Sequence, residues 1–317
     1  MILRPAHLKE IQDALSVANR QGGRVSGVDL GALNRVLEYS PEDMTVTAEA
    51  GMNLVDLQRQ LSERGQWLPL DPPQPKLVTL ERVLSENLSG PRQFGLGTAR
   101  DYLIGLKVAL ADGRVIKAGG RVVKNVAGYD LCKLFVGSRR TLGIIVEATF
   151  KLKPIPEEEV FLEARFDALE GVEGFLDRVL ESELTPVALD LHNLGQADGS
   201  HAGEPTVVIG FAGAREDVAY QKELAMALGA MTESSLNHET RFWSEPTPVA
   251  HRLSVLPSRL VEAVPGIGNA RYVARAGDGI LWHRGGVAPE RSGPVWELGE
   301  RLRRAYDPNG VFAEYSL

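Results

Sequence analysis

Short loops rich in glycine and serine recur in the first half of the chain, and their composition and spacing suggest a binding site. Five of them lie between predicted strands before residue 140, at residues 22–27, 88–90, 95–98, 119–120 and 137–138. Glycine lets the backbone approach a ligand closely, and successive N–H groups can donate to phosphate oxygens. One such loop is typical of a turn, whereas the run of them favours a site for an anionic dinucleotide. No G-x-G-x-x-G follows the first strand, which weighs against a nicotinamide-type doubly wound fold.

The side chains that usually perform acid–base or metal chemistry are scattered. The histidines of the second half stand isolated, without ligand spacing, and each is more typical of a core or surface histidine: His192, His201, His238, His251 and His283. The single cysteine, Cys132, lies on an apolar helix and predicts a buried core thiol. We therefore predict no metal site and identify no catalytic residue.

Composition and charge exclude several classes of protein. The formal net charge of −7 argues against a nucleic-acid binder, which needs a basic surface. One cysteine cannot form a disulfide within the chain, and no run of about 18 apolar residues predicts a membrane span. The start of the chain lacks the apolar core of a signal peptide. We expect a cytoplasmic protein, with any membrane association made through partners.

Periodicity in the first half predicts short helices and strands. Leu8, Ile11, Leu15 and Ala18 share one face of a helix over residues 7–21. Apolar residues alternate over 44–50, which is typical of a half-buried strand. The remaining predicted elements are a strand at 33–40, helices at 54–64 and 78–87, a hairpin of strands 104–111 and 114–118, and a strand at 142–152.

The pattern changes after residues 154–159, where two prolines and three glutamates predict an exposed linker. Beyond it, strands and two helices alternate in a way that predicts an antiparallel sheet with helices on one face. A last helix is expected over 295–305. The chain as a whole therefore reads as α+β, with domains at 1–155 and 156–317.

The order of motifs in the first half resembles a known family. The motifs are LSGPR at 88–92, GTARDYLIG at 97–105, VKNVAGYD at 123–130 and TLGII at 141–145. They are similar to the PCMH-type FAD-binding domain of the vanillyl-alcohol oxidase class. Within that class they most resemble the smaller FAD-binding subunits of bacterial glycolate oxidases. The resemblance is strong over residues 1–155 and weaker beyond.

The resemblance implies a fold and a cofactor site. It implies an FAD-binding domain of two α+β lobes, followed by an α+β cap domain whose C-terminal helix returns to the first domain. Gly22, Gly23 and Gly27 would lie near the pyrophosphate, Gly97, Arg100 and Asp101 would line the flavin cleft, and Gly143 and Ile145 would hold the adenine or ribose end. The cofactor-binding set is completed by Ser89, Gly90, Gly137 and Ser138. FAD would be bound non-covalently, because no histidine lies in the first glycine loop.

The resemblance also implies a function and partners. The chain would be the FAD-binding subunit of a glycolate oxidase-like complex that oxidises a 2-hydroxy acid, together with a larger FAD-binding subunit and an iron–sulfur subunit. Three positions depart from the family pattern, because Glu81, Arg82 and Arg140 replace family glycines. These departures leave an alternative open, in which the chain is a flavin-free structural subunit of the same fold.

Overall fold

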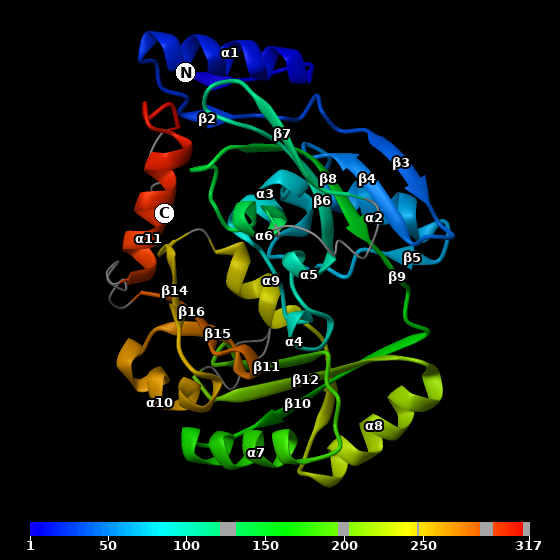
Figure 1. Ribbon diagram of the computed structural model, residues 1–317. Helices are drawn as coiled ribbons and strands as arrows, with labels where there is room; N and C mark the ends of the chain where they lie inside the picture. The colour runs from blue at the N-terminus through cyan, green and yellow to red at the C-terminus, as the bar shows by residue number, and fades with distance from the viewer. Residues whose placement is uncertain (121–130, 196–202, 246, 286–293, 313–317) are drawn as a thin grey trace. The chain divides into compact units, whose positions relative to one another are not determined.

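Two hydrophobic cores divide the chain into two units. The computed structural model describes residues 1–120, 131–195, 203–245, 247–285 and 294–312 (Figure 1). Unit 1 comprises Met1–Ser89, Thr98–Ile155 and the C-terminal segment that contains α11 (Pro294–Tyr306). Unit 2 comprises Gly90–Gly97 and the residues from Pro156 onward as far as that segment. Residues 123–130, which carry one of the sequence motifs, lie outside the described residues.

The segment Gly90–Gly97 differs from the division expected from the sequence, which placed it in the first domain. It contains the short helix α4 (Gln93–Leu96) where a loop was predicted. The N–H of Gly95 donates to the carbonyl of Val187 at 3.1 Å, and Phe94 packs against the core of unit 2. This short segment therefore belongs to unit 2.

The N-terminal helix of unit 1, α1 (Leu8–Gln21), forms as its periodicity predicts. Ile11, Leu15 and Ala18 are buried on one face, and Gly22 ends the helix with a left-handed φ of 67°. Such a conformation is easy only for glycine. The other elements of unit 1 outside its main sheet are β1 (Ile2–Leu3), β2 (Gly27–Val28), α2 (Leu54–Ser62), β5 (Gln66–Trp67), η1 (Pro75–Leu77), α3 (Leu80–Glu86), α5 (Ala99–Tyr102), α6 (Leu131–Phe135) and β9 (Lys153–Pro154).

The main sheet of unit 1 has five antiparallel strands in the order β3-β4-β8-β6-β7. Its strands are β3 (Val36–Ser40), β4 (Thr45–Glu49), β6 (Leu103–Ala109), β7 (Val115–Gly119) and β8 (Ile144–Lys151). The predicted hairpin is confirmed as β6 and β7. The strand predicted at 44–50 is confirmed as β4, but its expected half-burial was wrong, because every residue of β4 is buried.

Unit 2 is built on a seven-stranded antiparallel sheet in the order β13-β10-β12-β11-β15-β16-β14. Its strands are β10 (Glu158–Arg165), β11 (Ala188–His192), β12 (Thr206–Gly213), β13 (Thr232–Ser234), β14 (Ala250–Ser254), β15 (Arg271–Arg275) and β16 (Ile280–Arg284). Its helices are α7 (Leu169–Glu181), α8 (Arg215–Ala227), α9 (Asn237–Ser244) and α10 (Leu260–Ala263), with the short turns η2 (Pro257–Arg259), η3 (Val264–Ile267) and η4 (Ala276–Asp278). The predicted antiparallel sheet is confirmed.

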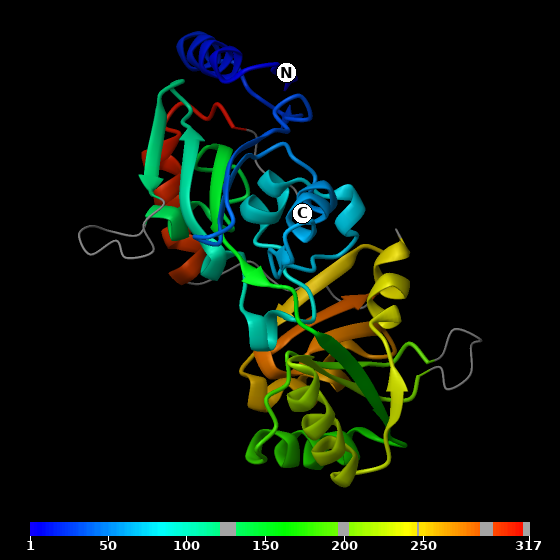
Figure 2. The same cartoon turned by 90° about the vertical axis from the view of Figure 1, so that its right-hand side faces the viewer.

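Helices cover both faces of this sheet, which corrects the expectation of helices on one face. Leu189 and Leu191 of β11 belong to the core formed with α7, α8 and α10. The residues that alternate with them, Asp190 and His192, contact α9 instead. Figure 2 shows α7 and α8 on one side of the strands and α9, in yellow, on the other. The face under α9 is the one that carries charged side chains into the interior.

Candidate functional site

The glycine-containing loop at residues 137–140 of unit 1 is joined to helix α3 by backbone hydrogen bonds. The N–H of Gly137 donates to the carbonyl of Leu84 at 2.9 Å, and the N–H of Arg139 donates to Ser85 at 2.7 Å. These bonds fix the loop at 137–140 against α3 and the residues that follow it. Arg100 is fixed at the same place, because its Nη2 donates to the carbonyl of Val136 at 2.9 Å.

Three buried polar atoms in this loop and in the residues that follow α3 have no hydrogen-bond partner among the described residues. They are Asn87 Oδ1, Ser89 Oγ and Ser138 Oγ, which we call the polar loop cluster. Asn87 is close to the 137–140 loop, since a Cβ added to Gly137 would lie 3.5 Å from the Asn87 Cβ. Each buried polar group without a partner costs about 1–3 kcal/mol. Three of them on adjoining loops indicate a place where a polar ligand can bind.

Beside these loops, an ion pair occupies positions at which the family pattern has glycine. Arg140 Nε donates to Glu81 Oε1 at 2.8 Å, and Arg140 Nη2 donates to Glu81 Oε2. Glu81, near the start of α3, is only 1% exposed. Arg140 has a φ of 63°, the left-handed conformation that glycine adopts most easily. Arg82, by contrast, points to the exposed side and pairs with Glu86 at 3.0 Å.

The first glycine loop serves local structure in this fold. Gly22 ends α1, and the N–H of Gly23 donates to Ala18 at 2.8 Å. Gly27 pairs with Ile2 in the parallel β1–β2 ladder. The structure gives each of these glycines a backbone role that does not depend on a ligand.

Four further predicted residues of unit 1 also have identifiable local roles. Asp101 caps α5, since its Oδ2 accepts from the Thr98 N–H at 2.7 Å and from the Thr98 hydroxyl at 2.9 Å. Arg100 lies next to it on α5 and reaches the 137–140 loop as described. Gly143 has a φ of 157°, and an added Cβ would lie 2.5 Å from Val108. Ile145 is buried and pairs with Val108 between β8 and β6.

Gly90 and Gly97 bound the segment that belongs to unit 2. The Gly90 carbonyl accepts from the Gln93 N–H at 3.2 Å. Gly97 has a φ of 90° and ends α4. Of the predicted set, Arg100 lies close to the 137–138 loop, since a Cβ added to Gly137 would lie 3.6 Å from Arg100 Nη2. Ser89 lies two residues after Asn87, which is close to the same loop. The other predicted residues lie in turns, caps or strands.

A buried ionic cluster in unit 2 was not predicted from the sequence. It consists of Asp190 on β11, His238 and Glu239 on α9, and Arg275 at the end of β15. Arg275 Nη1 donates to Asp190 Oδ2 at 3.0 Å and to Glu239 Oε1 at 2.7 Å, and its Nη2 donates to Glu239 Oε2 at 2.8 Å. His238 Nε2 lies 2.9 Å from Asp190 Oδ2. The Trp243 indole N–H completes the set with a 3.0 Å bond to Glu239.

The cluster contains ligand types for a cation, and the chain itself supplies that cation. One atom each from Asp190, His238 and Glu239 lies within 4.8 Å of the others. Two of the oxygens in this group accept hydrogen bonds from the Arg275 guanidinium. The guanidinium therefore takes the position that a metal ion would need, and the cluster carries no catalytic acid–base set open to substrate.

The charges of the cluster and its surroundings shift two pKa values. Burial alone would raise the pKa of Glu239, but the charge and hydrogen bonds of Arg275 outweigh it and lower that pKa. Burial, followed by the charges of His238, Arg241 and Arg165, lowers the pKa of His192 well below its usual value. The His192 ring stacks on His238 with centroids 4.7 Å apart. One signal could have indicated the cluster, namely the two titratable residues Asp190 and His192 that alternate with leucines in the otherwise apolar strand β11.

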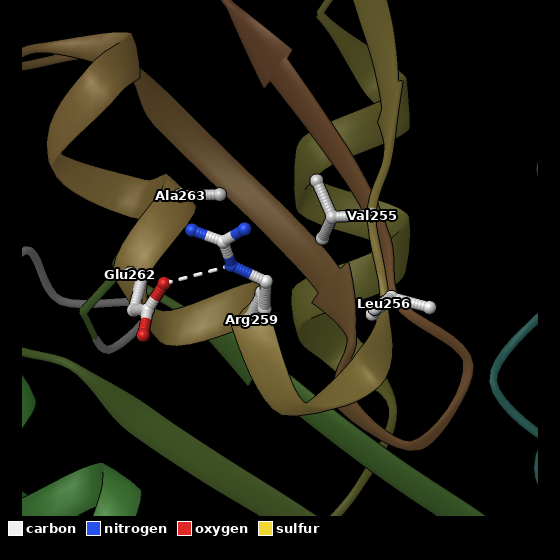
Figure 3. A pocket seen from close by; sticks show the side chains of 5 residues that line it. All are labelled: Val255, Leu256, Arg259, Glu262 and Ala263. Atoms are coloured by element: carbon white, nitrogen blue, oxygen red, sulfur yellow. Dashed lines mark hydrogen bonds and ion pairs between the residues drawn. The ribbon is translucent and has the colours of Figure 1, made fainter.

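Each unit carries a surface cavity of about 350 Å³. The cavity in unit 2 is lined by Val255, Leu256, Arg259, Glu262 and Ala263 (Figure 3). Its charged residues are paired, with Arg259 Nε 3.0 Å from Glu262 Oε2. The cavity in unit 1 is lined by Gly31, Asn34, Gly51, Met52, Asn53, Asp56, Arg59 and Gln60. Neither cavity contains a residue of the predicted cofactor set.

Comparison with known proteins identifies a flavin-dinucleotide-binding domain in the first part of the chain. Residues 24–119 match the family model described as FAD binding domain. A solved structure of alkyldihydroxyacetonephosphate synthase covers 100% of this chain and 77% of its own, with a TM-score of 0.74 and 14% identity, which shows the fold alone. The chain therefore contains a PCMH-type FAD binding domain, and the family and fold class predicted from the sequence are confirmed.

Two relatives are subunits of glycolate oxidase. The chain is 27% identical over 313 residues to glycolate oxidase subunit GlcE of Escherichia coli, covering 90% of this chain and 85% of GlcE. It is 38% identical over 158 residues to glycolate oxidase subunit GlcD of Bacillus subtilis. That match covers 50% of this chain and 34% of GlcD, so the chain spans about a third of GlcD. No helix in the described parts of the chain is long and apolar enough to cross a membrane.

The matched domain supports FAD as the cofactor, as the sequence predicted. The polar loop cluster fits such a ligand, because the Ser89 and Ser138 hydroxyls can donate to phosphate oxygens and the Asn87 amide can bond a sugar or ring. The Glu81–Arg140 pair is the part of these loops that departs from the family pattern. It places a carboxylate next to loops that otherwise suit an anion.

Proposed function

We propose that this chain is the FAD-linked subunit of a glycolate oxidase-type complex and supports the flavin-dependent oxidation of a 2-hydroxy acid. The observation that carries the proposal is the likeness to GlcE over nearly the whole chain, combined with the FAD binding domain at residues 24–119. The likeness to GlcD over half of this chain supports the same assignment. The substrate class is part of the proposal.

The residues of unit 1 that would hold FAD are Ser89, Gly137 and Ser138, with Arg100 near Gly137. The predicted contribution of Gly90, which belongs to unit 2, remains part of the proposal. The serine hydroxyls would donate to phosphate oxygens, and Gly137 would keep the backbone close to the ligand. The proposal also keeps the other residues predicted to contact FAD, at the backbone positions described above. They are Gly22, Gly23, Gly27, Gly97, Asp101, Gly143 and Ile145. Bound FAD supplies an acceptor for the two electrons taken from the hydroxy acid.

The partners follow from the same assignment. We propose a larger FAD-binding subunit, which would carry the substrate chemistry, and an iron–sulfur subunit that would accept electrons. The location would be the cytoplasm, with any contact to a membrane made through these partners. The buried ionic cluster of unit 2 supports this division of labour, because Arg275 binds the one group of ligand-type side chains found among the described residues.

The experiment is dye reduction with glycolate or D-lactate, by the purified chain alone and by the chain co-purified with a larger GlcD-type subunit. We expect activity only in the co-purified sample. The matched control is the larger subunit alone, which should be less active or less stable. Turnover by the isolated chain at about 1 s⁻¹ or faster, an ordinary enzyme rate, would place a catalytic site within it and contradict the division of labour. Failure of the two chains to co-purify would contradict the complex.

The flavin-free alternative is tested by the same preparation. The complex is denatured, and the amount of FAD released is compared with the molar amount of each chain. Flavin bound to both chains supports the proposed function, whereas flavin bound only to the larger subunit supports the structural role. The Glu81–Arg140 pair is the observation that favours this alternative.

A further inference from the structure

The Glu81–Arg140 pair adjoins the polar loop cluster. Arg140 follows Ser138 by two residues in a loop that is bonded to Leu84 and Ser85 of α3. Glu81 lies one turn earlier on the same helix. The ion pair, the helix and the orphaned hydroxyls are therefore parts of one connected structure within unit 1.

The pair uses a group that is well suited to binding phosphate. A guanidinium offers a planar set of donors that matches carboxylates and phosphates alike. Here two of these donors are directed at Glu81. The Glu81 side chain is 1% exposed and that of Arg140 is 29% exposed. Arg140 is thus the member of the pair that solvent or a ligand can reach.

We propose that Glu81 acts as an internal competitor for the pyrophosphate of FAD, by holding the Arg140 guanidinium that would otherwise bind a phosphate. The inference rests on the proposed flavin site at these loops, and it names Glu81 and Arg140 as the residues that set FAD affinity. Removal of Glu81 breaks its two hydrogen bonds with Arg140 and also removes a negative charge next to the anion. Removal of Arg140 has the opposite effect, because it leaves the buried Glu81 carboxylate without its partner.

The proposal predicts opposite signs for two single substitutions. Glu81→Gly should tighten FAD binding at least about tenfold, which corresponds to about 1.4 kcal/mol. Glu81→Gln keeps the size of the side chain and should give a smaller gain. Arg140→Gly should give no gain or a loss. A pair that blocked the site only by its bulk would instead make both glycine variants bind more tightly.

The measurement is FAD titration of the purified full-length chain, followed by quenching of flavin fluorescence and by thermal unfolding with and without FAD. Riboflavin, which has no phosphate, is the matched ligand and should gain little in Glu81→Gly. Glu49→Gln is the matched protein variant, because it breaks another partly buried ion pair of unit 1, that with Arg35. It should change stability without changing FAD affinity.

Three differences between variants or ligands would overturn the proposal. They are equal gains in Glu81→Gly and Arg140→Gly, an equal gain for riboflavin, and unchanged FAD affinity in Glu81→Gly and Glu81→Gln when both are folded by circular dichroism. Lack of FAD binding in every variant would also overturn it. None of these results depends on the glycolate assay, so they test this proposal separately from the proposed complex.

Discussion

Replacement of Arg275 by methionine removes the cation from the ionic cluster of unit 2 and keeps most of the apolar stem. Arg275 is 2% exposed and Asp190 is fully buried, so water cannot replace the lost hydrogen bonds. Removal of one partner from a buried ion pair typically costs about 3–5 kcal/mol, because a charge stays buried without compensation. We expect a loss of this size for unit 2. At about 2–4 °C per kcal/mol, the melting temperature should fall by about 6–20 °C.

The assay is urea unfolding of the full chain, followed by tryptophan fluorescence. Arg259→Met is the matched control, because it breaks the exposed pair with Glu262, whose side chains are 69% and 57% exposed. Exposed pairs contribute about 0–1 kcal/mol. If Arg275→Met and Arg259→Met lowered the free energy of unfolding by the same small amount, the reasoning that the cluster is dry and charged would be refuted.

The loss of stability caused by Arg275→Met should also depend on pH. In the wild type, folding lowers the pKa of Glu239. Its contribution to stability is therefore fully present above the unfolded pKa of about 4.3 and is lost as pH falls through the lower folded value. Without Arg275, burial favours the protonated carboxyl, so the defect of Arg275→Met should be smaller at pH 5 than at pH 7. A defect independent of pH would contradict a cause in buried charge.

Two other substitutions test the packing and electrostatics of the units. Folding lowers the pKa of His192, so the stability that His192 contributes is present above the unfolded pKa of about 6.5 and is lost as pH falls. His192→Gln should therefore remove up to about 2 kcal/mol of the change in stability between pH 7 and pH 5. The measurement is urea unfolding at the two pH values, with His251→Gln as the control. A Cβ at Gly51 would lie 1.9 Å from the Leu30 carbonyl oxygen, so Gly51→Ala should destabilise unit 1 by about 1–3 kcal/mol or more. Gly120→Ala meets nothing within 4 Å, and equal melting temperatures for the two glycine variants would count against the close contact.

Local patterns predicted much of the fold because the corresponding elements are specified by nearby residues. The helix α1 has a strong apolar period and a glycine at its end, and the hairpin of β6 and β7 turns at Asp112-Gly113. The helix α9, from Asn237 to Ser244, was missed because its buried face consists mainly of polar residues, His238 and Glu239, whose partners lie on distant strands. The complete burial of β4 depends on its place inside the sheet, between β3 and β8, and on what packs against it, which no local pattern reveals.

The site was less predictable, because its important contacts join residues far apart in the chain. Glu81 and Arg140 are separated by 59 residues, and Asp190 and Arg275 by 85. The sequence showed Glu81 and Arg140 as two separate departures from the family pattern. In the structure they compensate each other. The replacement of a family glycine by Glu81 is therefore matched by the replacement of another by Arg140, and the two positions form one feature.

Arg82 does not share that role, although it also replaces a family glycine. Its side chain is 48% exposed and pairs with Glu86 one turn later on α3. Arg82→Gly should therefore cost about 1 kcal/mol of stability through the lower helix propensity of glycine and leave FAD affinity unchanged within about twofold, a small free-energy difference. Arg82→Ala, with high helix propensity, is the control and should be close to wild type in both respects. If Arg82→Gly tightened FAD binding as much as Glu81→Gly, backbone access at the start of α3 would be the determining factor, and the charge of Glu81 would not.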